Sequence, residues 1–226
     1  MGENLAVRTQ FTSELIALTN DLTRMCVLAH DAVARVTDGL VDADLTATYE
    51  AFALDEQLRA MHGACEARAV VLLALQAPVA RDLRRVVTAI QIASELSLVG
   101  RLASEIADRV YQCHPEHVAR EPILGILAAM GQLSAQSTAR AGRAVAGQQP
   151  PTEAAEPMGR SMEALGHRLH STLCERAVQQ SPDTTITSAL IGHHLQRCVE
   201  HTARVDRLTL FLDTGIPPTA QAHDGQ

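Results

Sequence analysis

The chain has 226 residues, of which 46% are hydrophobic and only 2% aromatic, so its core must consist of aliphatic side chains. A formal net charge of −7 disfavours nucleic-acid binding, which requires a basic face. The longest apolar run, Ala69–Leu75, is far shorter than the roughly 20 residues that span a bilayer. With no secretory signal pattern and five cysteines that form no CxxC pair, we expect a cytoplasmic protein with free thiols.

A long first helix is predicted after a disordered lead-in over residues 1–8. Apolar side chains recur at alternating spacings of four and three from Phe11 to Val36, which is typical of a helix with one buried face. Gly39 follows this pattern directly, and we expect it to end the helix.

Two further helices complete the first half of the chain. Asp42 or Asp44 is expected to cap the second helix, which should end near Gln76 because proline disfavours helical backbone in the residue before it. Pro78 or Val79 then opens the third helix, since proline has no N–H to lose in a first turn. The apolar seam of this third helix is predicted to consist of Ile92, Leu96, Val99, Ala103, Ile106 and Val110.

Three more helices are predicted after a break at His114-Pro115-Glu116. The fourth starts near Pro122 and fades by Gly147, and the fifth covers roughly 153–180. The sequence Ser181-Pro182-Asp183 has the cap, proline and acid that begin a helix, so a sixth helix is predicted from there to Gly215.

The fold class predicted from this order is all-α, with two tandem three-helix bundles that repeat a pattern of three long helices. Short connections make neighbouring helices antiparallel. The expected domains are residues 9–113 and 120–215, and residues 216–226 are expected to be disordered.

Small residues form a strip on the third predicted helix, which indicates close packing against another element. Both a helix of the same bundle and a second subunit are possible neighbours for this strip. Its members are Ala93, Ser97, Gly100, Ser104 and Ala107.

The stretch LLALQAPVARDLRRVVTAIQIASE, Leu72 to Glu95, resembles the first-repeat signature of the PhoU family of bacterial phosphate-uptake regulators. The resemblance implies a cytosolic regulator, commonly a homodimer, that contacts the ATPase subunit of the phosphate ABC transporter and a membrane sensor histidine kinase. Such a protein represses phosphate uptake and the phosphate-starvation response and is not an enzyme. The absence of GxSxG, P-loop and GxGxxG motifs from the sequence agrees with this interpretation.

The family resemblance also implies an acidic metal-binding motif on the third helix of each repeat, and the first repeat departs from it. Glu95 and Gly100 match the motif, and Glu66 matches an acid of the preceding helix. Ser97 and Arg101 stand where further acids are expected, and an arginine repels a cation. We therefore expect no metal cluster of the family type in the first repeat.

The second repeat retains more of the metal-binding chemistry. Gln196 replaces an expected acid, but Glu200 and His201 follow it, and Glu163 and His167 share one face of the fifth helix. The candidate ligands for one divalent ion are Glu163, His167, Glu200 and His201, and no other cofactor is expected. The alternative is a patch of polar side chains that bond one another without metal. A metal-binding helical bundle is accordingly the second functional hypothesis.

Overall fold

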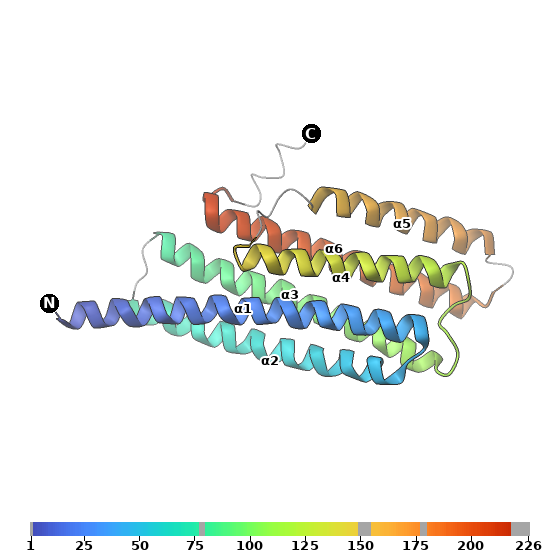
Figure 1. Ribbon diagram of the computed structural model, residues 1–226, viewed down its shortest axis with the longest axis horizontal. Coiled ribbons are helices and arrows are strands. Elements are labelled where there is room, and N and C mark those ends of the chain that lie inside the picture. The colour runs from blue at the N-terminus through green and yellow to red at the C-terminus, as the bar shows by residue number, and fades with distance from the viewer. Residues whose placement is uncertain (1, 77–79, 149–154, 177–179, 218–226) are drawn as a thin grey trace.

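The protein is described here by a computed structural model that places residues 2–76, 80–148, 155–176 and 180–217. Within these residues it consists of six α-helices and contains no β-strand, which confirms the predicted all-α fold. The helices, labelled in Figure 1, are α1 (Gly2–Asp42), α2 (Leu45–Gln76), α3 (Ala80–Cys113), α4 (Ile123–Val145), α5 (Ala155–Arg176) and α6 (Pro182–Thr214).

Several helix ends lie where the local sequence predicts them. The Asp44 carboxylate accepts a hydrogen bond of 2.8 Å from the Thr46 backbone N–H and so caps α2. The Ser181 hydroxyl accepts a hydrogen bond of 3.1 Å from the Thr184 N–H at the start of α6. Gly215 ends α6 with φ at 78°, the left-handed conformation that favours glycine.

The prediction that Gly39 ends the first helix is wrong. The helix α1 continues to Asp42, and the chain turns at Ala43, whose φ is 52°. A Cβ atom on Gly39 would lie 2.9 Å from the Thr48 hydroxyl, so this glycine lets the start of α2 lie close against α1. The residue serves helix packing and not helix termination.

Three other boundaries differ from the predictions or lie outside the described residues. Helix α1 begins at Gly2, so residues 2–8 are helical where we expected disorder. Helix α5 covers Ala155–Arg176 of the predicted 153–180, and the predicted helical residues 153–154 and 177–179 lie outside the described residues. The predicted opening of the third helix at Pro78 or Val79 lies outside the described residues, as does most of the predicted disordered C-terminal segment.

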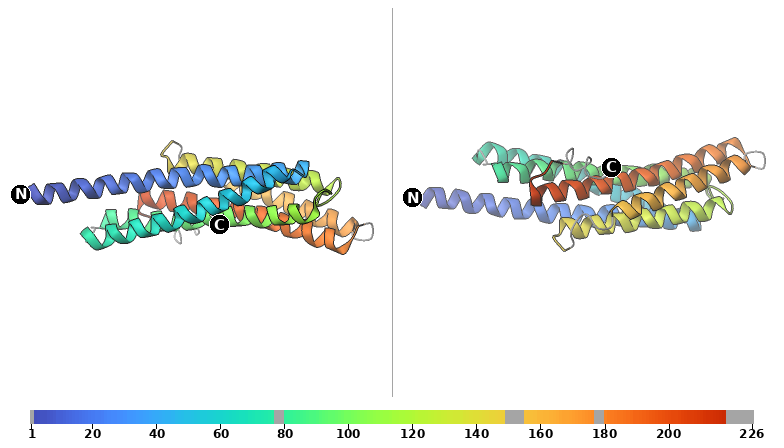
Figure 2. Two further views of the ribbon diagram at one scale, coloured as in Figure 1. Left: turned by 90° about the horizontal axis from the view of Figure 1, so that it is seen from below. Right: turned by 90° about the horizontal axis from the view of Figure 1, so that it is seen from above.

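The helices form an elongated stack in which equivalent helices of the two repeats pack on one another (Figures 1 and 2). Helix α1 packs on α4 and α3 packs on α6, while α2 covers α1 and α3 on one side and α5 covers α4 and α6 on the other. By length and composition the stretch Arg81–Cys113 of α3 is apolar enough to cross a membrane, but more than half of its most apolar window is buried in the stack. Its apolar character therefore suits the central place of α3.

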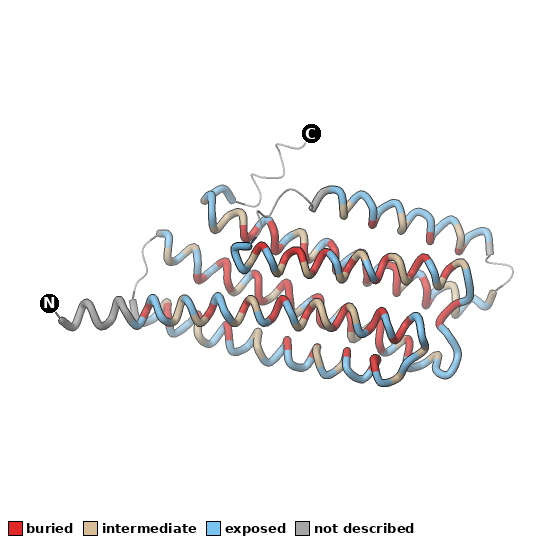
Figure 3. Tube along the Cα trace, in the orientation of Figure 1, coloured by how far each residue is buried: buried red, intermediate tan, exposed pale blue. Residues whose placement is uncertain are grey.

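The hydrophobic core is divided along the stack and not between the two repeats. Near one end, Met25 and Leu96 of the first repeat pack in one cluster with Cys198 of the second. Near the other end, Val36 of the first repeat shares a cluster with Leu127 of the second. Figure 3 shows the buried residues along the inner faces of the helices. Every predicted seam residue of α3 is buried, and each of the two clusters contains side chains of both repeats.

Glycines set how closely some of the helices approach. A Cβ atom on Gly100 of α3 would lie 2.5 Å from a methyl carbon of Leu58 on α2, so this glycine of the small-residue strip faces a helix of the same bundle. A Cβ atom on Gly131 of α4 would lie 2.5 Å from the hydroxyl and 2.7 Å from the methyl of Thr37 on α1. The absence of a side chain at Gly131 therefore fixes the distance between the two repeats.

Alanine substitutions at two helical glycines should have opposite effects on stability. Gly131→Ala forces a methyl group into Thr37 and should lower the free energy of unfolding by about 1–3 kcal/mol. Gly63→Ala, at an exposed helical position with nothing within 4 Å, should raise it by about 0.5–1 kcal/mol through helix propensity. Urea denaturation of both variants tests the packing, and equal effects would contradict it.

A seam of polar side chains lies buried between α4 and α6. The Ser134 hydroxyl donates a hydrogen bond of 3.0 Å to the carbonyl oxygen of Leu195. One turn further on, the hydroxyls of Ser137 and Thr202 are 2.6 Å apart. The seam continues with an ion pair between Arg140 and Asp206, of which only 7% and 2% are exposed. Burial raises the pKa of Asp206 to about 6, because its effect outweighs the attraction of Arg140.

The pH dependence of stability should reveal this buried carboxyl group. Its pKa in the folded protein lies above the ordinary value of 3.8, so the unfolded chain releases this proton first as the pH rises. The contribution of Asp206 to stability should therefore fall between pH 4 and pH 6 and stay level above pH 6. Urea unfolding of the wild type should show this loss, and Asp206→Asn should lack it. If the difference in free energy of unfolding between wild type and Asp206→Asn did not change between pH 4 and pH 6, the raised pKa of Asp206 would be contradicted.

Candidate functional site

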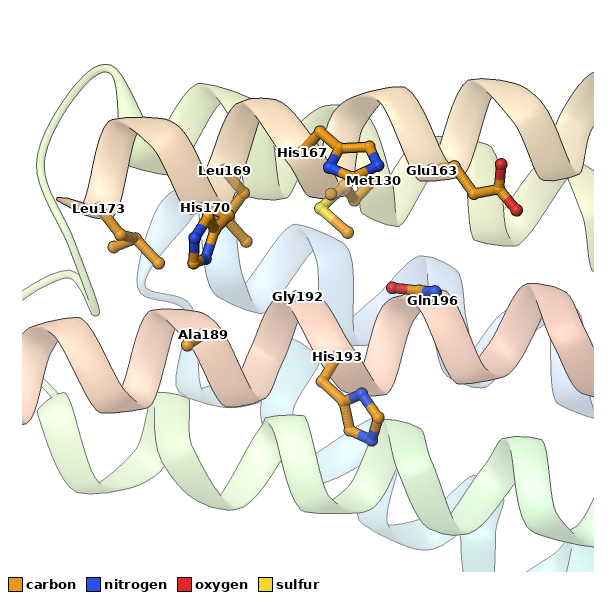
Figure 4. A pocket seen from close by; sticks show the side chains of 11 residues that line it. Met130, Glu163, His167, Leu169, His170, Leu173, Ala189, Gly192, His193 and Gln196 are labelled. Carbon is orange, nitrogen blue, oxygen red and sulfur yellow. The ribbon is translucent and has the colours of Figure 1, made fainter. Parts of the chain in front are cut away.

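A cleft of about 310 Å³ lies between α5 and α6 (Figure 4). Helix α5 contributes Glu163, His167 and His170, whose spacings of four and three residues place them on one face. Helix α6 contributes Gly192 and Gln196 from the opposite side. With His193 of α6, the lining of the cleft therefore includes one carboxylate, three imidazoles and one amide along a solvent-accessible edge.

The floor of the cleft is apolar. A Cβ atom on Gly192 would lie 2.3 Å from a methyl carbon of Leu169, so this glycine admits the α5 side chain against the α6 backbone. Met130 of α4 and Leu173 of α5 are almost fully buried beneath the rim. The polar groups thus lie at the mouth of the cleft, where water reaches them.

The histidines around the cleft do not converge on one point. His170 is paired with Cys174 of its own helix, at 3.7 Å between ring nitrogen and sulfur. The ring of His193 points away from α5 in Figure 4 and lies 6.1 Å from the ring of His194. Within residues 2–76, 80–148, 155–176 and 180–217, no group of three or more His, Cys, Asp or Glu side chains is arranged to hold a metal ion.

The predicted ligand His201 faces the other repeat. Its Nδ1 atom lies 2.7 Å from one carboxylate oxygen of Glu95 on α3, and the Arg204 Nε donates to the other oxygen at 3.1 Å. Glu95 is only 7% exposed, so it is a buried carboxylate with both oxygens engaged. This cluster joins the third helix of one repeat to the third helix of the other.

The predicted ligand Glu200 is engaged within its own helix. It accepts from Arg197 at 3.3 Å and from the Gln196 amide at 3.4 Å. A second nitrogen of Arg197 lies 3.4 Å from the Nε2 atom of His201. When Arg197 donates to Nε2, the imidazole is neutral and carries its proton on Nδ1, which then donates to Glu95.

The four predicted metal ligands therefore form two separate groups. Glu163 and His167 lie at the cleft, whereas Glu200 and His201 belong to the hydrogen-bonded network that includes Glu95. The second group has the form of the alternative that the sequence left open, a patch of polar side chains that bond one another. A divalent ion bound by all four residues stays a prediction.

Basic side chains stand beside the acids that the first repeat retains. Arg204 forms an ion pair with Glu95 at 3.1 Å, and Arg101 pairs with Glu105, also at 3.1 Å. His194 of α6 also lies 3.2 Å from Glu105, and burial is the main cause that lowers the pKa of this imidazole. Sequence reasoning recognised Arg101 but missed Arg204, since nothing in the local pattern indicates that this residue meets a carboxylate on another helix.

Truncation of the two glutamates should separate the buried interaction from the exposed one. Glu95→Ala leaves the partly buried imidazole of His201 without its acceptor and should lower the free energy of unfolding by about 1–3 kcal/mol. Glu200→Ala removes an exposed pair and should change it by at most about 0.5 kcal/mol. Chemical denaturation midpoints measure both, and equal values would contradict the assignment of Glu95 as the link between repeats.

Comparisons with known proteins agree with the resemblance seen in the sequence. A family model described as "PhoU domain" matches residues 22–110. The Phosphate-specific transport system accessory protein PhoU homolog 1 of Mycobacterium leprae is 32% identical over 213 residues, which cover 94% of this chain and 96% of that protein. Homolog 1 of Mycobacterium tuberculosis strain H37Rv is 33% identical over 215 residues and is covered to 97%.

Solved structures share the fold over nearly the whole chain. The phosphate transport system regulatory protein PhoU from Streptococcus pneumoniae superposes with a TM-score of 0.78 at 23% identity, covering 91% of this chain and 98% of that one. PhoU from Pseudomonas aeruginosa superposes with a TM-score of 0.74 at 20% identity, covering 91% of this chain and all of the other. With relatives at more than 30% identity that it covers almost completely, this chain belongs to the PhoU family.

Proposed function

We propose that this protein is an accessory regulator of a phosphate-specific transport system. It acts in the cytoplasm as a negative regulator of phosphate uptake and phosphate-starvation signalling. Its partners are the ATPase subunit of the phosphate ABC transporter and a sensor histidine kinase, which it contacts as a homodimer through its surface and without a chemical step.

The observation that carries this proposal is the match to accessory proteins along almost their entire length. The 32% identical relative is matched over 96% of its sequence, so the resemblance is not confined to one shared helix pair. The fold also suits an adaptor, because α2 and α5 each pack on only two other helices among the described residues and leave outward faces for partners. Fold alone does not fix function, which is why the sequence match carries the argument.

The replaced acids of the first repeat shape the proposed mechanism. Arg204 supplies positive charge beside Glu95, an acid of the family's metal motif, and Arg101 stands in the place of another such acid and pairs with Glu105. We expect the first repeat to keep its shape through these ion pairs. Regulation by this protein should then be independent of any metal in that repeat.

A metal-binding role at the cleft is the second candidate function. The shared face of Glu163, His167 and His170 favours it, because a carboxylate and two imidazoles suit a divalent ion. Elemental analysis of protein purified without chelator separates the two functions. One bound ion per chain, released by His167→Ala or by Glu200→Ala, would favour the metal-binding role.

The regulatory proposal is tested by deleting the gene in a strain with a phosphate-starvation reporter. The reporter should be active in phosphate-rich medium after deletion, and the wild-type gene should silence it again. Unchanged repression in the deletion strain would refute the proposal. Light scattering of the purified chain tests the homodimer, and binding assays with the two purified partners test the contacts.

Two variants distinguish loss of the fold from loss of a site. Leu96 is fully buried, so Leu96→Glu places a carboxylate in the core at a cost of several kcal/mol out of a total stability of about 5–15 kcal/mol. We expect this variant to melt early and to lose repression. His167→Ala should stay folded and repress almost normally, because one exposed polar group rarely dominates binding.

The same reporter, read beside thermal melting, decides between the two candidate functions. A His167→Ala variant that is folded, well expressed and wholly inactive would place the metal-binding role ahead of the adaptor role. A folded Leu96→Glu variant would contradict the packing of α3 in the core.

A further inference from the structure

Both tyrosines of the chain lie together at one end of the stack. The chain contains two Tyr, three Phe and no Trp. The rings of Tyr49 on α2 and Tyr111 on α3 have centroids 6.1 Å apart and meet edge to face, and the Phe52 ring lies 6.4 Å from that of Tyr49. We call these three residues the tyrosine patch. It holds three of the five aromatic residues of the chain.

The patch is exposed although the chain has few aromatic side chains to bury. Tyr49 is 55% exposed and Tyr111 is 49% exposed. Phe52 is partly buried and packs against the hydrophobic cluster beneath, so it attaches the patch to the core. Exposed tyrosines on a firm base are typical of the residues that dominate protein–protein binding.

Local hydrogen bonds hold the backbone on both sides of the patch. Asp44 caps the start of α2 one turn before Tyr49, through its bond to the Thr46 N–H. The His114 Nδ1 atom lies 3.2 Å from the Ala43 carbonyl oxygen, which ties the chain beyond α3 to the turn between α1 and α2. The backbone near the two rings is therefore held in place, which reduces the entropy that would be lost when a partner binds.

Carboxylates are concentrated in the sequence that flanks the residues of the patch. Residues 36–58 include six Asp or Glu and no Lys or Arg. Three of these six carboxylates form ion pairs, with Arg35 or Arg59, which lie just outside the segment. Asp108 adds a further carboxylate one turn before Tyr111, where it accepts a hydrogen bond from Gln112. The acidic rim comprises the carboxylates that have no ion-pair partner among the described residues: Asp42, Asp44, Glu56 and Asp108.

We infer that the tyrosine patch and its acidic rim form the docking surface for an arginine-bearing segment of a protein partner. A guanidinium group stacks on aromatic faces and pairs with carboxylates, so it matches both components of the surface. A second copy of the chain would bring like charges together across a two-fold axis, and the rim repels anionic lipid and nucleic acid. The inference rests on the proposed adaptor function and specifies the chemistry of its partner.

The scarcity of aromatic residues provides a direct test. Growth on 3-fluorotyrosine gives the full chain two fluorine resonances, one from each residue of the pair, which Tyr49→Phe and Tyr111→Phe assign. The probes are the purified transporter ATPase subunit, the purified cytoplasmic part of the sensor kinase, and a short tyrosine-free helical peptide with arginines on one face. A matched peptide with glutamates in place of the arginines is the control.

We expect the arginine peptide and at least one of the two proteins to shift both resonances, and the glutamate peptide to leave them unchanged. The double variant Tyr49→Ala/Tyr111→Ala should bind that protein at least about tenfold more weakly, measured by calorimetry. Added salt should weaken binding to the wild type, because the rim acts through charge. Val70→Ala, a change at a residue 64% exposed on the same helix, should bind as the wild type does.

The outcomes separate this inference from the proposed function. If a protein partner binds the wild type and the double alanine variant equally and leaves both resonances unchanged, the inference is overturned and the adaptor function stands. If neither protein binds the wild type, the adaptor function fails. The two peptides then test the docking surface by themselves, through the fluorine resonances of the two tyrosines. A shift caused by the arginine peptide alone then supports the docking surface, and no shift overturns it.

Discussion

The packing of α1 on α4 and of α3 on α6 is the interaction on which the rest of the structure depends. Each hydrophobic cluster combines side chains from both repeats, so a single three-helix bundle would leave an apolar stripe exposed to water. Gly131 permits this approach, because even one methyl group at that position would collide with Thr37. The two repeats therefore contribute to the same hydrophobic clusters, although they are separate in the sequence.

Buried polar groups add specificity to this apolar contact. Arg140 and Asp206 pair inside the second repeat, while Glu95 reaches from α3 to His201 and Arg204 of α6. Each such group would be costly to bury alone, so helices that slid past one another would lose far more than apolar contact. The link at Glu95 also occupies the carboxylate that the family pattern would offer to a metal ion.

The outer surface offers two different kinds of site for the proposed regulator. The cleft lined by Glu163 and His167 lies between α5 and α6, where its polar groups face water. The tyrosine patch lies on α2 and α3 and combines aromatic rings with an acidic rim. Because the two sites belong to different repeats, a partner at the patch and a ligand at the cleft have no need to compete.

The sequence by itself determined what depends on neighbours along the chain, namely the six periodic helices, the caps at Ser181 and Gly215, and the membership of the family. It misjudged Gly39, because a glycine after a helical pattern indicates a helix end unless another helix needs the space. Only the tertiary structure decided the contacts between distant residues. His201 meets Glu95 across 106 positions of sequence, and Tyr49 meets Tyr111 from a different helix. Such contacts follow from the angles and registers at which whole helices pack, and no single stretch of sequence encodes them.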